Sequence, residues 1–155
     1  MSAHRVLVVD DNESLAETVA GILADEGFAV EVASSGAQAL ITWRARPAEV
    51  VLVDVDLPDI GGIRLARRLA SRGGCRLLVM SAHDPRRLVP VCEELGVAFL
   101  PKPFTSTRLL KAVRAMASKM HAEAERNASP HRRMLGPREP RGLLQHVRRR
   151  SPWPG

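Results

Sequence analysis

Short aliphatic runs alternate with amphipathic stretches over the first 118 residues of the chain. Runs of a few residues rich in Val and Leu are typical of β-strands in a protein core. They predict five strands, at Val6–Val9, Val30–Ala33, Val50–Val55, Leu77–Met80 and Ala98–Leu100. The run VVLVDV at residues 50–55 is almost entirely aliphatic, which favours a strand that is covered by helices on both faces.

The stretches between these runs predict helices because their apolar residues recur at helical spacing. Leu15, Val19 and Leu23, for example, would share one face of a helix. The first helix should start at Asn12 and stop at Gly27, and a Ser35–Gln38 capping box should start the second. Gly73-Gly74 should end the third helix. Asp84-Pro85 should start the fourth, and Thr105 or Ser106 the fifth. Pro90 falls inside the fourth helix, which we therefore expect to be kinked or to start late.

The alternation of strands with helices defines the expected fold class, an α/β protein with a doubly wound parallel sheet. Right-handed crossovers place helices on both faces of such a sheet. Its ligand site lies outside the carboxyl ends of the strands, where the strand order reverses. Polar residues occur at four of the five predicted strand ends: Asp10 with Asp11, Asp54, Ser81 and Lys102.

These five side chains suit phosphate chemistry. Asp10, Asp11 and Asp54 would raise one another's pKa unless a cation lay among them, and Mg²⁺ or Mn²⁺ suits carboxylate oxygens. A carboxylate can also act as a nucleophile and accept a phosphoryl group, while Lys102 and Ser81 could contact the phosphate oxygens. The set contains no general base for attacking water, which favours a stoichiometric event over rapid turnover.

The net charge of +6 is distributed unevenly along the 155 residues. Residues 1–118 carry 14 Lys and Arg and 14 Asp and Glu, whereas residues 119–155 carry 9 and 3, so the excess lies at the C-terminal end. We expect a neutral folded domain at residues 1–120. Residues 121–155 would form a basic, Pro- and Arg-rich, disordered tail.

Several features favour a cytoplasmic protein without a membrane contact. The chain shows no leader peptide and no apolar stretch approaching the roughly 20 residues that a membrane helix needs. Cys75 and Cys92 lack metal-ligand and redox spacing, so we expect reduced cysteines that serve packing.

Four motifs together carry a family resemblance. The segments VLVVDDNE, VLVDVDLPDIGG, VMSAHD and FLPKPF, in this order and at these spacings, resemble the receiver domain of two-component response regulators. The resemblance covers about residues 4–118, which is essentially the whole predicted domain. It implies a flavodoxin-like fold with five parallel strands in the order 2-1-3-4-5.

The resemblance implies a phosphoacceptor and its metal ligands. Asp54 would accept phosphate from a sensor histidine kinase or a histidine phosphotransfer protein. Asp11 and Asp54 would bind Mg²⁺ directly and Asp10 through water. The backbone carbonyl of Asp56 would complete the protein ligands.

The same resemblance implies a phosphate-driven switch. Lys102 and Ser81 would bind phosphate oxygens, and Pro103 would fix the Lys102 loop through a cis peptide bond. Movement of Ser81 toward the phosphate would open a space into which Phe99 could turn. This would remodel the face of the fourth helix, fifth strand and fifth helix, where a downstream target protein would bind. Phe99 lacks a hydroxyl, so any output contact through it would be apolar.

Two neighbouring positions leave the phosphate lifetime open. Asp56 and His83 lie two residues after Asp54 and Ser81, at positions that look like lifetime modulators in this family, and no lifetime follows from the residues themselves. On this interpretation the chain is a stand-alone signalling phosphoacceptor of a phosphorelay and not an enzyme.

Other interpretations are weighed beside this one. The sequence DVDLP resembles the D-x-D motif of haloacid-dehalogenase-type phosphatases, but that motif usually opens the first strand and here lies on the third. The basic tail could instead bind nucleic acid by charge and act as the effector. Asp10 and Asp11 taken alone could simply cap the first helix. The combined motifs favour the receiver.

Overall fold

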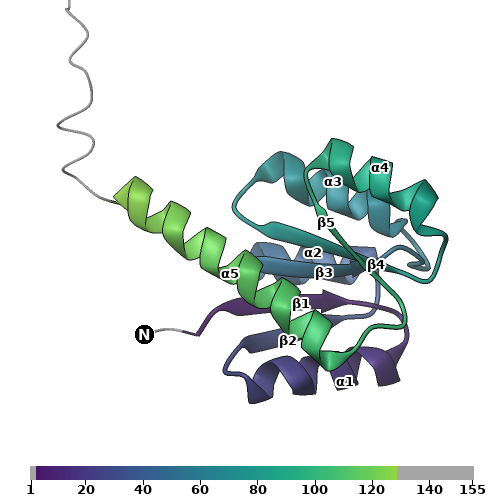
Figure 1. Ribbon diagram of the computed structural model, residues 1–155, viewed down its shortest axis with the longest axis horizontal. Coiled ribbons are helices and arrows are strands. Elements are labelled where there is room, and N and C mark those ends of the chain that lie inside the picture. Colours follow the sequence, from purple (N-terminus) through teal and green to yellow (C-terminus); the bar gives the residue numbers. More distant parts are fainter. Residues whose placement is uncertain (1–2, 129–155) are drawn as a thin grey trace, which may run out of the picture. The chain divides into compact units, whose positions relative to one another are not determined.

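Residues 3–128 are described by the computed structural model of the protein, and they form five strands and five helices in strict alternation (Figure 1). The strands are β1 (Arg5–Val9), β2 (Ala29–Ala33), β3 (Val50–Asp54), β4 (Arg76–Ser81) and β5 (Ala98–Pro101). The helices are α1 (Glu13–Asp25), α2 (Gly36–Ala45), α3 (Gly62–Arg72), α4 (Pro85–Leu95) and α5 (Ser106–Ala128). The five predicted βα units are confirmed, with strand ends within one residue of those expected.

The five strands form one parallel sheet in the order β2-β1-β3-β4-β5. The chain runs from β1 outward to β2 and then crosses back to β3, so the strand order reverses between β1 and β3. The carboxyl ends of these two strands lead into Asp10 and Asp54. The switch point of this doubly wound fold, where such sheets bind ligands, therefore lies between two carboxylates.

Residues that alternate along the central strands face two separate hydrophobic cores. One core lies under α1 and α5, where Leu23 and Leu109 pack with Val6 and Val8. The other lies under α2, α3 and α4 and includes Leu7, Val9, Leu40, Leu65, Leu69 and Cys92. All five residues of β3 are buried, as its aliphatic run predicted for a strand covered on both faces.

Both cysteines are free and contribute to packing, as expected. Cys92 is buried in the core under α4, and Cys75 is half-buried at its edge. Burial raises the pKa of both thiols, that of Cys75 to about 11, so neither is a reactive thiolate at neutral pH.

Across residues 3–128, none of the helices combines the length and the apolar composition that crossing a membrane requires.

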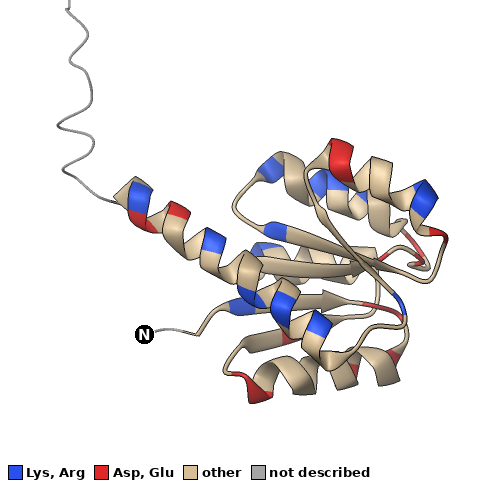
Figure 2. Cartoon of the chain, viewed as in Figure 1, with Lys and Arg blue, Asp and Glu red and all other residues tan. Residues whose placement is uncertain are grey.

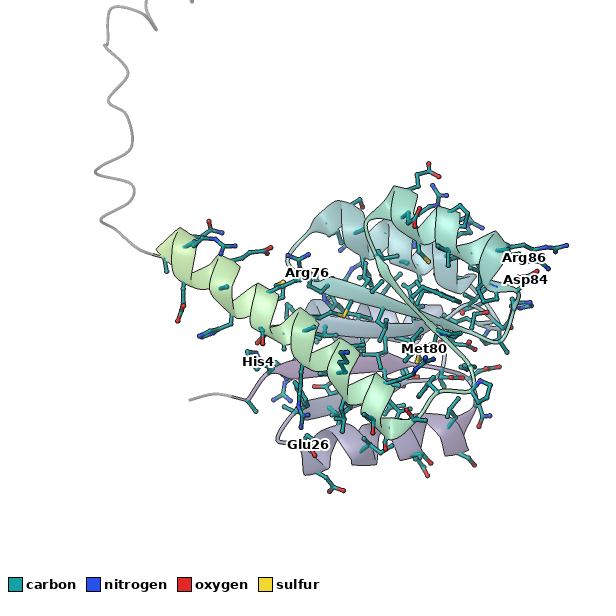
Figure 3. The ribbon with its side chains drawn as sticks, in the orientation of Figure 1. His4, Glu26, Arg76, Met80, Asp84 and Arg86 are labelled. Carbon is teal, nitrogen blue, oxygen red and sulfur yellow. The ribbon has the colours of Figure 1, made fainter. Side chains whose placement is uncertain are left out.

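Side-chain caps begin α1 and α4 where the sequence predicted them. Asn12 Oδ1 accepts a hydrogen bond from the N–H of Leu15 at 3.1 Å. Asp84 accepts from the N–H of Arg86 at 3.0 Å, and the two side chains also pair at the exposed start of α4 (Figure 3). These caps satisfy N–H groups that the first helical turn leaves without a partner.

The start of α2 differs in one detail from the expected capping box. Ser35 Oγ accepts from the N–H of Gln38 at 3.1 Å, as predicted. The Gln38 side chain, however, accepts from the N–H of Ser34 at 2.7 Å and not from that of Ser35. The box is therefore half formed. At α5, the cap is Thr105, whose hydroxyl accepts from the N–H of Arg108 at 3.2 Å.

α4 begins at Pro85 and continues through Pro90 to Leu95. The expectation of a late start is therefore wrong, because the Asp84 cap and a proline at the first helical position both favour a start at this point. Pro90 has no N–H to donate to the carbonyl of Arg86, four residues earlier in the helix. Both residues are exposed, so water can donate to that carbonyl instead.

The loop between β3 and α3 is held against α2. Asp59 accepts hydrogen bonds from the N–H groups of Gly36 at 2.9 Å and Ala37 at 2.8 Å. These bonds hold the pKa of Asp59 below its ordinary value. At the other end of the loop, the Gly62 N–H donates to the Val55 carbonyl at 2.9 Å. The start of α3 therefore lies directly against the backbone of Asp54 and Val55.

We expect Gly62→Ala to destabilise the protein strongly. A Cβ at this position would lie 2.0 Å from the Asp54 carbonyl oxygen, so α3 or β3 would have to shift. The free energy of unfolding should fall by about 2–4 kcal/mol, measured by urea denaturation. The adjacent Gly61 provides a matched control, because a Cβ there meets nothing within 4 Å. Equal stability of the two variants would contradict the close packing of α3 on Asp54.

Candidate functional site

The carboxylates that follow β1 and β3 form an acidic cluster at the switch point of the sheet. Ligand atoms from Asp10, Asp11 and Asp54 all lie within 4.8 Å of one another. Asp10 and Asp54 are buried, with 1% and 6% of their surfaces exposed, whereas Asp11 is exposed. The fold therefore brings together the three acids that the motifs singled out.

Lys102 bridges the two buried acids. Its Nζ donates to Asp10 Oδ2 at 2.9 Å and to Asp54 Oδ1 at 3.2 Å. Its backbone N–H donates to the Ser81 carbonyl at 2.8 Å, which ties the end of β5 to the end of β4. The peptide bond between Lys102 and Pro103 is cis, as the resemblance implied. The lysine is thus fixed at its backbone while its amine enters the acidic cluster.

Burial and charge act in opposite directions on these groups. Desolvation raises the pKa of Asp54 above its ordinary value, and the Asp10 charge raises it further, while Lys102 offsets part of this effect. For Lys102, burial alone lowers the pKa, but the hydrogen bond and charge of Asp10, supported by Asp54, outweigh burial and raise it. The lysine therefore stays protonated at neutral pH and only partly compensates the acids.

The donor set fits a hard divalent cation. Three carboxylates and one ammonium group contribute −3 and +1, so the cluster carries a formal charge of −2 when its acids are ionised. Carboxylate oxygens at this density match the ligands that Mg²⁺ and Mn²⁺ take in proteins. Asp11, the exposed member, gives the cluster an opening to solvent. Asp56, whose backbone carbonyl was expected as a further ligand, lies in the loop directly after β3.

A hydrogen-bonded pair joins the loops that follow β3 and β4. His83 Nε2 contacts both carboxylate oxygens of Asp56, at 2.9 and 2.8 Å. Ser81 Oγ accepts from the His83 N–H at 2.9 Å, and Ser81 itself is buried. The sequence indicated where these residues lie relative to Asp54 and Ser81, but it did not predict the contact between Asp56 and His83.

Phe99 lies on β5 beside Val79 of β4. It is partly buried and packs against the core under α2, α3 and α4. Phe99 therefore lies at the edge of that core.

Comparison with known proteins assigns the chain to a family. The response regulator receiver domain model matches residues 6–114, and the protein belongs to that family. The sensory transduction protein RegX3 of Mycolicibacterium smegmatis is 33% identical over 112 residues, which cover 72% of this chain and 49% of RegX3. The DNA-binding response regulator MtrA of Mycobacterium leprae is 37% identical over 113 residues, covering 72% of this chain and 50% of MtrA. The chain spans about half the length of these relatives.

Solved structures agree with the expected flavodoxin-like fold. The receiver domain of NtrX from Brucella abortus matches with a TM-score of 0.69 at 26% identity, over 73% of this chain and 98% of that domain. A CheY-like response regulator receiver domain protein from Methanospirillum hungatei matches with a TM-score of 0.74 at 24% identity, over 79% of this chain and 99% of that protein. The second likeness supports the fold alone. The strand order that the resemblance implied is confirmed.

We expect Asp54→Asn to stabilise the metal-free protein. Asparagine removes a buried charge that Asp10 repels, so the free energy of unfolding should rise by roughly 1 kcal/mol at neutral pH in the presence of a chelator. Because the pKa of Asp54 is raised in the folded state, its ionisation opposes folding as the pH rises. The gain should be complete above the folded-state pKa and should disappear below the ordinary value of 3.8, where both states are protonated.

Urea denaturation at a series of pH values measures this effect. Asp25→Asn, an exposed aspartate at the end of α1, is the control and should leave stability nearly unchanged at every pH. A loss of stability in Asp54→Asn at neutral pH would mean that the Lys102 contact outweighs the repulsion.

Proposed function

We propose that the protein is a phosphoacceptor in two-component signal transduction and that Asp54 is the residue that becomes phosphorylated. The contact of Lys102 with Asp54, inside a cluster of three carboxylates at the switch point of a receiver fold, carries this proposal. Membership of the receiver domain family supports it.

The hydrogen bonds favour Asp54 over Asp10 as the nucleophile. Both oxygens of Asp10 accept hydrogen bonds, Oδ1 from the Asn12 N–H at 3.0 Å and Oδ2 from Lys102. Lys102 reaches Oδ1 of Asp54, whereas Oδ2 of Asp54 accepts no hydrogen bond from the residues within 3–128. We therefore assign the attack to Asp54 Oδ2.

The reaction transfers a phosphoryl group from nitrogen to oxygen. Asp54 Oδ2 forms the new bond to phosphorus while the P–N bond of a phosphohistidine on the donor breaks, and the departing imidazole takes up a proton. The donor is a sensor histidine kinase or a histidine phosphotransfer protein. Lys102 already contacts Asp54, so its amine could donate to an oxygen of the new phosphate. The Ser81 hydroxyl could donate to another of these oxygens after a change of rotamer.

The acidic cluster would hold Mg²⁺, or Mn²⁺ in its place. Asp11 and Asp54 would be direct ligands, Asp10 would act through water, and the backbone carbonyl of Asp56 would complete the set. When bound, the cation supplies positive charge that offsets the acids and the phosphate oxygens. Asp10 meanwhile holds the Lys102 amine beside Asp54 through the 2.9 Å hydrogen bond.

The output of phosphorylation would be a protein contact through α4, β5 and α5. Ser81 lies at the end of β4, directly before the loop that leads into α4, and Phe99 lies on β5 and is partly buried. Movement of Ser81 toward the phosphate, followed by Phe99, would change this face for a downstream target protein.

We propose a signalling role in the cytoplasm and no catalytic turnover of other substrates. A haloacid-dehalogenase-type phosphatase would use the second acid of its D-x-D motif on the leaving group, whereas Asp56 is engaged with His83. Asp56 holds the imidazole Nε2 of His83, and Ser81 Oγ accepts from the His83 backbone N–H.

The organisation of residues 121–155 stays a prediction. α5 extends to Ala128, and residues 129–155, which include most of the expected disordered tail, lie outside the described residues. The alternative in which the tail binds nucleic acid as the effector is therefore untested, and the family assignment favours the receiver function.

Incubation with acetyl phosphate tests the phosphoacceptor directly. Intact mass measurement should show one added phosphoryl group in the presence of Mg²⁺, and none after chelation or in Asp54→Asn. Asp25→Asn should be labelled like the wild type. Labelling that persists in Asp54→Asn would show that another residue is the acceptor.

Lys102→Met should slow this labelling at least tenfold, which corresponds to about 1.4 kcal/mol of lost charge stabilisation. It should also lower the free energy of unfolding, because the buried Asp10 loses its cation. Lys111→Met, an exposed lysine of α5, is the matched control and should leave both quantities unchanged. An unchanged labelling rate in a folded Lys102→Met protein would exclude the assigned role.

A further inference from the structure

α3 carries a concentrated positive charge on its outer side. Its eleven residues include four arginines and no acid. Arg64, Arg67, Arg68 and Arg72 are all exposed, while Leu65, Ala66 and Leu69 of the same helix are buried. Figure 2 shows the contrast with α1, which carries acidic residues and no Lys or Arg. We call these four residues the α3 arginine face.

The arginine face has no anionic partner within residues 3–128. The guanidinium groups of its four members make no hydrogen bond or salt bridge there. Among the other arginines of the same domain, Arg5, Arg46, Arg86 and Arg114 pair with carboxylates. The exposed Arg44, Arg87 and Arg108 show no such pair among the described residues, but each lies apart from the others and not on one helix face with three more arginines. Arg64 and Arg68, and likewise Arg68 and Arg72, are four residues apart, so like charges repel across adjacent helical turns. This repulsion destabilises α3, and an external anion bound at the arginine face would relieve it.

We propose that the α3 arginine face binds the phosphate backbone of a nucleic acid without reading its sequence. A helix rises about 1.5 Å per residue, so Arg64, Arg68 and Arg72 succeed one another at about 6 Å along its axis. Duplex DNA carries about one charge per 1.7 Å of its axis, so a surface of this length faces several phosphates. The planar guanidinium group matches phosphate geometry better than the ammonium group of lysine.

The composition of this face argues against a protein partner. Arginine is itself frequent at protein interfaces, but there it acts beside buried aromatic or apolar side chains that fill pockets on the partner. Among the described residues, the exposed large hydrophobic side chains are Val32 and Ile41, which lie on β2 and α2 and not on α3. The face also lacks aromatic residues on which bases could stack, so it would contact backbone only.

The charge of the whole chain supports the same partner. The net charge is +6, and its excess lies in residues 119–155, outside α3. This charge attracts a polyanion over long range, and the arginine face supplies the localised contact. The face is separate from α4, β5 and α5, so binding there would not use the proposed output surface.

Fluorescence anisotropy of a labelled mixed-sequence DNA duplex with the full chain tests the proposal. The variant replaces all four arginines of the face by glutamine. The control replaces four exposed basic residues elsewhere and changes the net charge equally: Arg44→Gln, Arg87→Gln, Arg108→Gln and Lys111→Gln. Circular dichroism and acetyl phosphate labelling verify that both proteins fold.

We expect the Kd of the α3 variant to rise at least tenfold and that of the control less than threefold at low salt. The log–log slope of affinity against salt should become shallower by about 3.6, since each of the four lost phosphate contacts contributes about 0.9. The same slope change should appear with an unrelated duplex sequence, because the contact is to backbone.

Several results would overturn the proposal. Equal weakening in both variants would show that only total charge matters. Unchanged affinity in the α3 variant, with binding lost on removal of residues 129–155, would assign binding to that segment alone. Absence of duplex binding by the wild type would also reject the proposal. If the wild type then self-associated or bound polyglutamate, and the α3 variant did not, the partner of the arginine face would be an acidic protein surface.

Discussion

Two buried carboxylates share one ammonium group at the centre of this protein, and the rest of the site depends on that imbalance. Lys102 contacts both Asp10 and Asp54, but one positive charge cannot compensate two buried negative charges and the exposed Asp11. Buried charge without full compensation is costly. The metal-free site is therefore poised to take up a cation, which is the condition that phosphate transfer to a carboxylate requires.

The fold tolerates this arrangement because stiff elements hold each group. Asp10 directly follows β1, Asp54 ends the adjacent strand β3, and Lys102 is tied to β4 through its own N–H. α3 starts on the Asp54 backbone, where only glycine fits. The stability that the hydrophobic cores provide permits an unfavourable charge cluster at one edge of the sheet, as is common for functional sites.

The sequence predicted those features that follow from periodicity and from strand topology. β3 could be located because an all-buried strand leaves an aliphatic run, and Asp10, Asp54 and Lys102 could be grouped because parallel strands end at one edge. Contacts between loops have no such signal. The Asp59 bonds to the start of α2 and the pairing of His83 with Asp56 depend on how separate loops meet in space. Gln38 shows the same limit, since its side chain accepts a hydrogen bond from the N–H of Ser34 and not from the expected N–H of Ser35.

A hydrogen bond to Ser81 must break before the loop between β4 and α4 can rearrange around that side chain. The free-energy cost of breaking it is the minimum that any such rearrangement must offset. The Ser81 hydroxyl, which is buried, accepts a hydrogen bond from the N–H of the exposed His83. Rotation of that hydroxyl toward Asp54 leaves the amide without its acceptor, at a cost of about 1 kcal/mol or more until water or another group replaces it. If Asp54 is phosphorylated as proposed, the doubly charged phosphate would offset this cost, whereas a weak interaction at Asp54 would not. On that proposal the loop would be insensitive to small fluctuations and would respond to a covalent event.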